Sequence, residues 1–146
     1  MSFEIALGYT LKFEGGYVNN PVDPGGATNK GITQSVYDAY RVQKNLPKQT
    51  VKLISDNEVK EIYLNQYWNV AGCDKLEDKL SIVVFDAAVN HGPGRAKKWL
   101  MITTDPKKYL DIRQEFFKKI VANKPSQSIF LKGWLNRVEG LRKIIA

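Results

Sequence analysis

Apolar and polar positions recur with helical spacing along most of the chain. The clearest stretch is residues 80–91, whose same-face positions fall at i, i+3, i+4, i+7, i+8 and i+11. Those positions are Leu80, Val83, Val84, Ala87, Ala88 and His91. The spacing predicts a central buried helix, and Gly92-Pro93-Gly94 predicts its end.

Start and stop signals predict the other helices of the first half. We expect a short apolar helix over residues 3–13 and a second helix over residues 34–44 with Thr33 as its N-cap. Ser55 and Glu58 have the spacing of a capping box, which predicts a third helix that runs to about Trp68. Its inner face is expected to carry Val59, Ile62, Tyr63 and Tyr67.

The second half is predicted to be helical as well. A short helix is expected through Trp99 and Met101, and Asp105-Pro106 marks the start of the next. The inner face of that next helix is expected to be Tyr109, Ile112, Phe116 and Ile120. A last helix is expected to carry Leu131, Trp134, Leu135, Val138, Leu141 and Ile145.

Residues 17–33 break the helical pattern. The turn formers Asn19-Asn20-Pro21 and Asp23-Pro24-Gly25-Gly26 predict a loop or a small β-hairpin there. A chain of 146 residues has the size of one ordinary domain. The sequence therefore predicts one mainly α domain over residues 1–146, with about six to eight helices and one irregular or hairpin region.

Charge is distributed unevenly over this domain. The net charge is +7, but residues 1–94 carry nine basic and eleven acidic side chains, whereas residues 95–146 carry thirteen basic and four acidic ones. A basic half predicts an anionic partner, such as nucleic acid, an acidic membrane surface or an acidic wall polymer. The sequence contains no recognition helix or aromatic-basic motif, so we expect no nucleic-acid partner.

Other residue counts exclude several kinds of chemistry. Cys73 is the one cysteine and His91 the one histidine, so an intramolecular disulfide and a histidine-cluster metal site are excluded. We expect neither a metal nor another cofactor. The start of the chain has no basic segment, and no apolar run approaches the ~18 residues that span a bilayer. Synthesis in the cytosol without a recognisable export signal is therefore expected.

The irregular stretch also carries the candidate chemistry. Glu14 ends the first apolar helix, and Gly15-Gly16 would let backbone or ligand approach it closely. Asp23 lies nine residues further on, in a polar turn. Two carboxyls in unlike surroundings allow a glycosidase to combine a proton donor with an ionised partner, and Thr28 could hold a water or substrate hydroxyl between them. The spacing alone also fits a solvated glutamate and an ordinary turn.

Longer motifs narrow these possibilities. The chain contains Glu14-Gly-Gly-Tyr17 followed by Asn19-Asn-Pro-Val-Asp23-Pro-Gly-Gly-Ala-Thr28-Asn-Lys-Gly-Ile-Thr33. Later it contains Tyr67-Trp68, Phe85-Asp86-Ala-Ala-Val-Asn90-His91-Gly-Pro-Gly and Phe130-Leu-Lys-Gly-Trp134-Leu-Asn-Arg137-Val. Together these motifs resemble glycoside hydrolase family 108, a family of bacteriophage and prophage endolysins in the lysozyme-like superfamily. The resemblance covers most of the chain.

The resemblance implies a fold and an activity. It implies a lysozyme-like domain with a catalytic lobe over residues 1–78 and a basic helical lobe over residues 79–146 that resembles the family's accompanying peptidoglycan domain. The implied reaction is hydrolysis of the β-1,4 bond between N-acetylmuramic acid and N-acetylglucosamine in peptidoglycan, for host cell lysis. Glu14 is implied as the proton donor. Similarity to phage-type lysozymes adds Asp23 and Thr28 as its catalytic partners, with Thr33 as a competitor for the threonine.

The same resemblance suggests further roles. Tyr17, Asn20 and Thr33 are candidates for substrate binding, with Tyr17 stacking on a sugar ring. Asn90 and His91 either line the saccharide cleft or form a structural cap at the end of their helix. We expect the partners to be peptidoglycan glycan strands and, through the basic half, anionic wall or outer-membrane polymers. The enzyme is expected to act as a monomer after release through a holin-type membrane lesion.

Two alternatives remain open at this point. The chain could be a peptidoglycan-binding module without catalysis, although such a module has no reason to retain Glu14, Asp23 and Thr28 together. It could also be a chitinase-like glycosidase of the same superfamily, which would use the same acid–base chemistry on a glycan without the muramic lactyl group.

Overall fold

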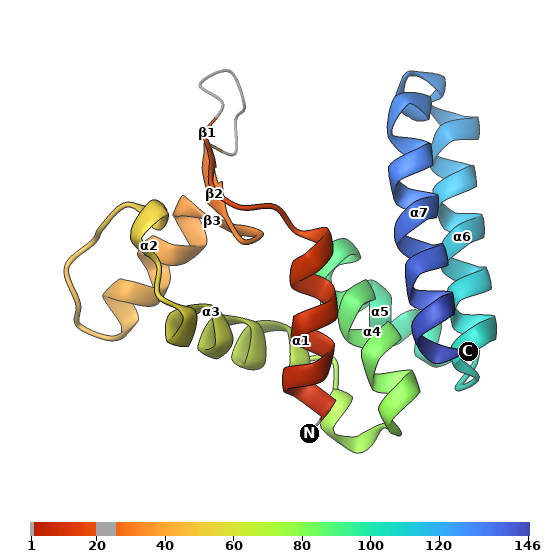
Figure 1. The fold of residues 1–146 in the computed structure, drawn as a ribbon, viewed down its shortest axis with the longest axis horizontal. Coiled ribbons are helices and arrows are strands. Elements are labelled where there is room, and N and C mark those ends of the chain that lie inside the picture. Colours follow the sequence, from red (N-terminus) through yellow and green to blue (C-terminus); the bar gives the residue numbers. More distant parts are fainter. Residues whose placement is uncertain (1, 20–25) are drawn as a thin grey trace. The chain divides into compact units, whose positions relative to one another are not determined.

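The fold is mainly helical, as the sequence predicts. A computed structural model describes residues 2–19 and 26–146, in which seven α-helices accompany a small three-stranded antiparallel sheet (Figure 1). The chain forms two compact units. We call Leu7–Gln66 the hairpin unit, and Met1–Ala6 together with Tyr67–Ala146 the helical unit. Within the described residues, no helix is both long and apolar enough to cross a membrane.

The hairpin unit contains the sheet and two helices. The first helix, α1 (Ser2–Phe13), leads into it from the helical unit. Its other elements are β1 (Val18–Asn19), β2 (Ala27–Asn29), β3 (Ile32–Thr33), α2 (Gln34–Gln43), a 3₁₀ turn (Val51–Leu53) and α3 (Asp56–Tyr63). The strands pair in chain order, so the hairpin predicted within residues 17–33 is confirmed for the described part of that stretch.

Both predicted N-caps are present in the hairpin unit. Thr33 Oγ1 accepts a hydrogen bond from Val36 N at 3.2 Å and caps α2. At the start of α3, Glu58 N donates to Ser55 Oγ at 3.1 Å and Ser55 N donates to Glu58 Oε1 at 3.0 Å. Each bond satisfies an amide that the helix itself leaves unpaired, which is why these residue types start helices.

The helix after Ser55 changes character before its predicted end. Following Tyr63 it widens into a π-helical turn (Leu64–Trp68), which changes the direction in which later side chains point. Trp68 is consequently buried, while Tyr67, expected on the inner face, is half-buried.

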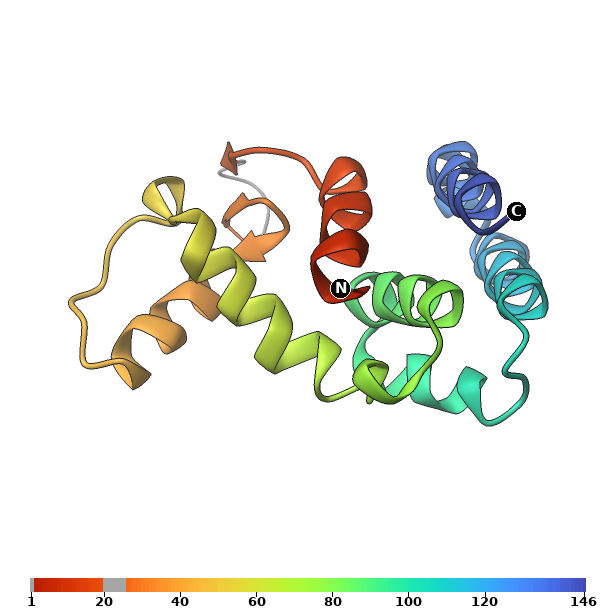
Figure 2. The same ribbon diagram turned by 60° about the horizontal axis from the view of Figure 1, so that its bottom comes forward.

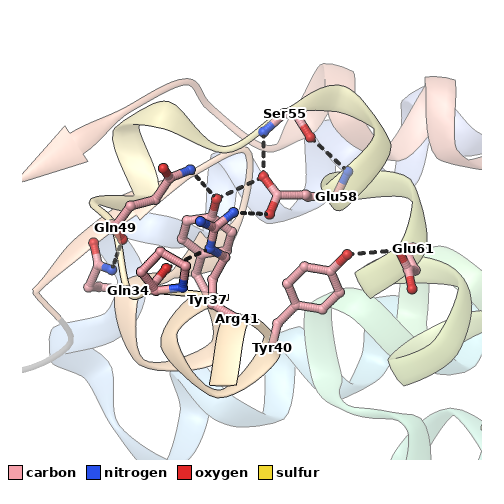
Figure 3. Close-up of polar contacts among 9 residues, drawn as sticks. Gln34, Tyr37, Tyr40, Arg41, Gln49, Ser55, Glu58 and Glu61 are labelled. Atoms are coloured by element: carbon pink, nitrogen blue, oxygen red, sulfur yellow. Dashed lines mark hydrogen bonds and ion pairs between the residues drawn. The ribbon is translucent and has the colours of Figure 1, made fainter. Parts of the chain in front are cut away.

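Side-chain hydrogen bonds join α2 to α3 (Figure 3). Tyr37 Oη donates to Glu58 Oε1 at 2.7 Å, and Arg41 Nη1 forms an ion pair with Glu58 Oε2 at 3.1 Å. Gln49 Nε2 donates to Tyr37 Oη at 2.6 Å, and Tyr40 Oη donates to Glu61 Oε2 at 2.7 Å. These bonds hold α3 against α2, and the Glu58 carboxylate serves both the capping box and the helix–helix contact.

A second set of bonds ties the sheet to this pair of helices. Asn29, at the end of β2, donates through Nδ2 to the carbonyls of Val51 and Lys52 at 3.1 and 3.2 Å. Val51 N in turn donates to Gln34 Oε1 at 2.7 Å. The 3₁₀ turn is therefore bound to both β2 and α2, which fixes the sheet within its unit.

The helical unit is built around the predicted central helix. Its elements are a 3₁₀ turn (Cys73–Lys75), α4 (Asp78–His91), α5 (Pro93–Leu100), α6 (Pro106–Asn123), a 3₁₀ turn (Pro125–Gln127) and α7 (Ser128–Ile145). Residues 80–88 of α4 are all buried, and Gly92, with φ of +94°, ends the helix as predicted. Helices α6 and α7 lie side by side and antiparallel (Figures 1 and 2).

The buried face of α6 differs from the prediction. Tyr109, Leu110, Arg113 and Phe117 are buried. Of the expected residues, Tyr109 alone belongs to this set, and Ile112, Phe116 and Ile120 are half-buried. The face is rotated because Arg113 is fully buried beside an acidic partner, and a rule that places arginine on the polar side cannot anticipate this. In α7, the buried residues likewise include Arg137, and Trp134 is half-buried.

That acidic partner is Asp86 of α4, which is 0% exposed. Asp86 Oδ2 accepts from Arg113 Nη1 at 2.6 Å and from Arg137 Nε at 2.9 Å, and Oδ1 accepts from Arg137 Nη2 at 2.9 Å. Burial alone would raise the pKa of Asp86, but the two guanidinium groups lower it to about 2. One ionised carboxylate therefore joins α4, α6 and α7.

Candidate active site

Glu14 lies directly at the end of α1. Its backbone N–H donates to Thr10 O at 3.1 Å, which continues the last helical turn, and its side chain is half-buried. A β-carbon added at Gly15 or Gly16 would meet no atom of the described residues within 4 Å, so the space beside both glycines is open in this part of the structure. No described backbone uses this space, and the expected close approach of a ligand to Glu14 stays a prediction.

The backbone of the chain itself approaches the Glu14 side chain at another glycine. Lys30 and Gly31 join β2 to β3 with φ of 53° and 79°, the left-handed conformations that a two-residue hairpin turn requires. A β-carbon added at Gly31 would lie 3.1 Å from Glu14 Cγ, 3.2 Å from Glu14 Cδ and 2.5 Å from Tyr63 Oη. The side chain of Glu14 thus lies against the β2–β3 turn, where only glycine leaves it room.

The two candidate threonines lie opposite one another in the sheet. Thr28 of β2 pairs with Thr33 of β3 and, on its other side, with Val18 of β1. The Thr33 hydroxyl accepts from Val36 N, whereas the Thr28 hydroxyl takes part in no hydrogen bond with residues 2–19 or 26–146. This difference favours Thr28 as the threonine that assists Glu14.

The remaining candidates of the hairpin unit are only partly described. Tyr17 is 38% exposed, and Lys52 Nζ lies 5.5 Å from the centroid of its ring. A sugar stacking on Tyr17 would have to use the face that the ammonium leaves open. Asp23 and Asn20 fall outside the described residues, so their catalytic and binding roles stay predictions.

Asn90 and His91 belong to α4 in the helical unit. Arg113 donates from Nη2 to Asn90 Oδ1 and from Nε to His91 Nε2, both at 2.9 Å. The His91 ring also lies against Trp99, with ring centroids 5.1 Å apart. Burial, with Arg113 nearby, lowers the pKa of His91 to about 3. The imidazole is therefore a neutral acceptor for Arg113, a structural contact that leaves the predicted substrate role as a prediction.

Two further candidates for chemistry can be assessed from their surroundings. Burial, followed by the nearby Asp74 carboxylate, raises the pKa of the Cys73 thiol to about 12, so this cysteine is a poor nucleophile. Among the described residues, no group of three or more His, Cys, Asp or Glu side chains is placed to hold a metal ion.

Sequence reasoning missed two residues of this site. Gly31 lay within the Asn-Lys-Gly motif, where a short hairpin turn was a detectable signal. Tyr63 was placed on the inner face of its helix, but a buried tyrosine hydroxyl requires a hydrogen-bond partner, and that partner is Lys30 O at 2.6 Å. No local pattern could have identified a carbonyl 33 residues away as the acceptor.

Comparison with known proteins places these residues in a family. The family model for glycosyl hydrolase 108 matches residues 7–92, more than half of the chain and all of the hairpin unit. The chain belongs to glycosyl hydrolase family 108. A comparison with curated proteins finds no match.

The fold of this family 108 protein has a relative among solved structures. It is similar to the structure of Brucella abortus SagA, with a TM-score of 0.76 and 28% sequence identity over 98% of this chain and 92% of that chain. The predicted lysozyme-like, mainly α fold is confirmed. Membership of family 108 makes the chain a glycoside hydrolase that acts on peptidoglycan.

Proposed function

We propose that this family 108 enzyme is a muramidase that cleaves the β-1,4 bond between N-acetylmuramic acid and N-acetylglucosamine, with Glu14 as its general acid. The observation that carries the proposal is the position of Glu14. Its Cγ and Cδ lie 3.1 and 3.2 Å from the β-carbon position of Gly31, in the same sheet that carries Thr28. A carboxylic acid held by a rigid turn is suited to donate a proton to a bound glycan.

The reaction begins with proton transfer from Glu14 to the glycosidic oxygen as the bond to the anomeric carbon breaks. Asp23 then stabilises the oxocarbenium-like state or orients the attacking water, with Thr28 holding a hydroxyl or the water itself. Thr28 suits this role because its hydroxyl is not used by a described backbone or side-chain group.

We assign the basic half to attraction between the enzyme and its polymer. Residues 95–146 carry thirteen basic and four acidic side chains, and the paired lysines Lys97-Lys98 and Lys107-Lys108 are exposed. Long-range attraction to anionic wall polymers raises the local concentration of enzyme at the substrate. In this proposal the protein serves host cell lysis as a monomeric endolysin that reaches the wall through a holin-type membrane lesion.

The decisive experiment replaces the proposed acid and identifies the products. Glu14→Gln keeps the size of the side chain but cannot donate an acidic proton, so solubilisation of purified peptidoglycan should fall at least about a hundredfold. Glu4→Gln is the matched control, because Glu4 is an exposed glutamate on the same helix. Mass spectrometry of the wild-type digest should show new reducing-end muramic acid.

Other outcomes would identify the alternatives. Near-normal activity of folded Glu14→Gln protein would remove Glu14 from the mechanism. Reducing-end glucosamine would show a glucosaminidase, and an anhydro product would show a lytic transglycosylase. Binding of wild-type protein to peptidoglycan without any release of fragments would indicate a binding module, and cleavage of chitin oligomers in preference to peptidoglycan would indicate a chitinase-like enzyme.

A further inference from the structure

The side chains of Tyr63 and Glu14 both pack against Gly31, at the position where any other residue would carry its β-carbon. The β-carbon position of Gly31 lies 2.5 Å from Tyr63 Oη and within 3.2 Å of both Glu14 Cγ and Glu14 Cδ. Real β-carbon contacts do not approach to 2.5 Å, so no other L-residue fits there without displacing one of the two neighbours. Tyr63 Oη and the Glu14 side chain are therefore packed over the same atom of the turn.

Tyr63 also fixes the turn itself. The side chain is 1% exposed, and its hydroxyl donates to Lys30 O at 2.6 Å. Lys30 O belongs to the peptide group that links Lys30 to Gly31, so this bond sets the orientation of the peptide plane beside Glu14. Tyr63 is buried while Lys30 is half-buried, so moving the turn would leave the tyrosine hydroxyl without this acceptor, and that cost favours a fixed turn.

The other end of α3 also holds the turn. Lys30 Nζ forms an ion pair with Asp56 Oδ1 at 2.6 Å, and Asp56 is the first residue of α3 while Tyr63 is the last. The Asp56 side chain is 84% exposed, so this ion pair contributes less than the part-buried hydrogen bond of Tyr63. Helix α3 thus presents the β2–β3 turn to Glu14 chiefly through Tyr63.

We propose that Tyr63 is a positioning residue for catalysis, which acts through the Lys30–Gly31 peptide to hold the Glu14 carboxyl in its donating position. The inference rests on the proposed role of Glu14 as general acid. Tyr63 itself is not required to touch the substrate. Because a proton donor acts only from a narrow range of positions, a small displacement of the turn lowers the rate of the chemical step and leaves substrate binding nearly unchanged.

The first test is Tyr63→Phe, assayed on soluble peptidoglycan fragments. We expect kcat to fall about tenfold with KM within twofold of wild type, since the lost interaction affects the transition state and not ground-state binding. Tyr40→Phe is the matched control: Tyr40 is also buried, lies in the same unit and donates to a glutamate, Glu61. Its kcat should be unchanged. A kcat for Tyr63→Phe within twofold of wild type would overturn the proposal.

The second test asks whether Tyr63 and Gly31 affect kcat through the same peptide group of the β2–β3 turn. Gly31→Ala introduces a methyl group against both Tyr63 Oη and Glu14, and we expect it to lower kcat at least tenfold. Because both changes act through one peptide group, and because Tyr63→Phe removes the oxygen that the new methyl group meets, Gly31→Ala/Tyr63→Phe should have a kcat no lower than that of Gly31→Ala alone. Effects that multiply instead would show that the two residues act independently and would contradict the proposal.

The two proposals fail in different ways. If Glu14→Gln remains active, the general-acid assignment is wrong, whatever Tyr63→Phe does. If Glu14→Gln is inactive while Tyr63→Phe has normal kcat, Glu14 keeps its assignment and only the positioning role of Tyr63 is refuted. Circular dichroism and urea unfolding of each variant establish that the assayed protein is folded at the assay temperature.

Discussion

The two units hold their polar side chains in contrasting ways. In the helical unit, the side chains of Asp86 and Arg113 are both 0% exposed and join α4 to α6. In the hairpin unit, the corresponding pair of Arg41 and Glu58 is 13% and 14% exposed, and the proposed acid, Glu14, is half-buried. The helical unit fixes its helices through a fully buried carboxylate, whereas the hairpin unit joins α2 to α3 through a partly exposed ion pair and leaves the Glu14 side chain partly exposed.

The largest effect on stability is expected at Asp86, whose buried charge distinguishes the helical unit from the hairpin unit. Asp86→Asn removes the counter-charge of two buried arginines, so the free energy of unfolding should fall by about 3–5 kcal/mol. Asp111→Asn is the matched control, because Asp111 pairs with Arg142 in the same unit but is 63% exposed, and it should change stability by less than about 1 kcal/mol. Urea denaturation of both variants measures the difference, and equal effects would contradict the structural role of burial.

Low pH should destabilise the helical unit through His91, which accepts a hydrogen bond from Arg113, the buried partner of Asp86. The folded-state pKa of His91 is lowered to about 3 from the ordinary value of 6.5, so the unfolded chain binds a proton in this range and the native chain does not. The stabilising contribution is therefore complete above pH 6.5 and is lost as the pH falls toward 3. His91→Gln retains an acceptor for Arg113 and should flatten the decline in unfolding free energy between pH 6.5 and 4. An unchanged decline would exclude His91 as its cause.

Wild type and His91→Gln should both lose further stability at lower pH. The pKa of Asp86 is lowered to about 2, so its contribution is present above its ordinary pKa near 4 and disappears as the pH falls through 2. Once His91 is protonated in the folded wild type as well, near and below pH 3, urea unfolding should show the same further fall in unfolding free energy between pH 3 and 2 for wild type and His91→Gln. Divergence there would mean that another group dominates acid unfolding.

In the hairpin unit, the paired threonines Thr28 and Thr33 should separate an effect on catalysis from an effect on stability. Thr28→Val should lower kcat about tenfold, equivalent to about 1.4 kcal/mol of transition-state stabilisation, with little change in stability. Thr33→Val should do the reverse, because it removes the cap of α2 at a cost of about 1 kcal/mol and leaves kcat nearly intact. Kinetics and urea unfolding of both variants give the comparison, and a larger kcat loss in Thr33→Val would exchange the two assignments.

The smallest effect is expected at the exposed lysines. Replacing Lys97, Lys98, Lys107 and Lys108 by glutamine should lower activity on whole walls several-fold at low salt and leave activity on short soluble fragments unchanged. Added salt should reduce the wild-type advantage, because attraction between exposed charges is screened. An equal loss on both substrates would show that these lysines do not act by attracting the enzyme to the wall.

The sequence predicts most of what depends on neighbouring residues. The caps at Thr33 and Ser55, the end of α4 at Gly92 and the hairpin near residues 17–33 follow from local chemistry, and the structure confirms them. The family could also be recognised, because its motifs are local runs of residues. Long-range contacts have no such local signal, and the prediction fails where they decide the outcome.

Two positions illustrate those failures. The inner face of α6 was misplaced because Arg113 is buried by Asp86, 27 residues earlier in the chain. The contact between Gly31 and the Glu14 side chain is not predicted at all, because the two residues lie far apart in the sequence. In both cases the contact joins residues that are distant in sequence. Periodicity and turn preference depend on neighbouring residues, so they cannot predict such a contact.

The contact of Asp86 with Arg113 and Arg137 also affects how this chain can be divided or joined to another protein. The segment matched by the family model ends at residue 92, so it contains Asp86 but neither Arg113 nor Arg137. A chain cut at that boundary would retain a carboxylate evolved for a dry interior without either of its cations. In this chain the matched segment therefore lacks both cations of its buried aspartate, and we expect a chimera that joins it to another C-terminal region to need the two arginines or a replacement of Asp86.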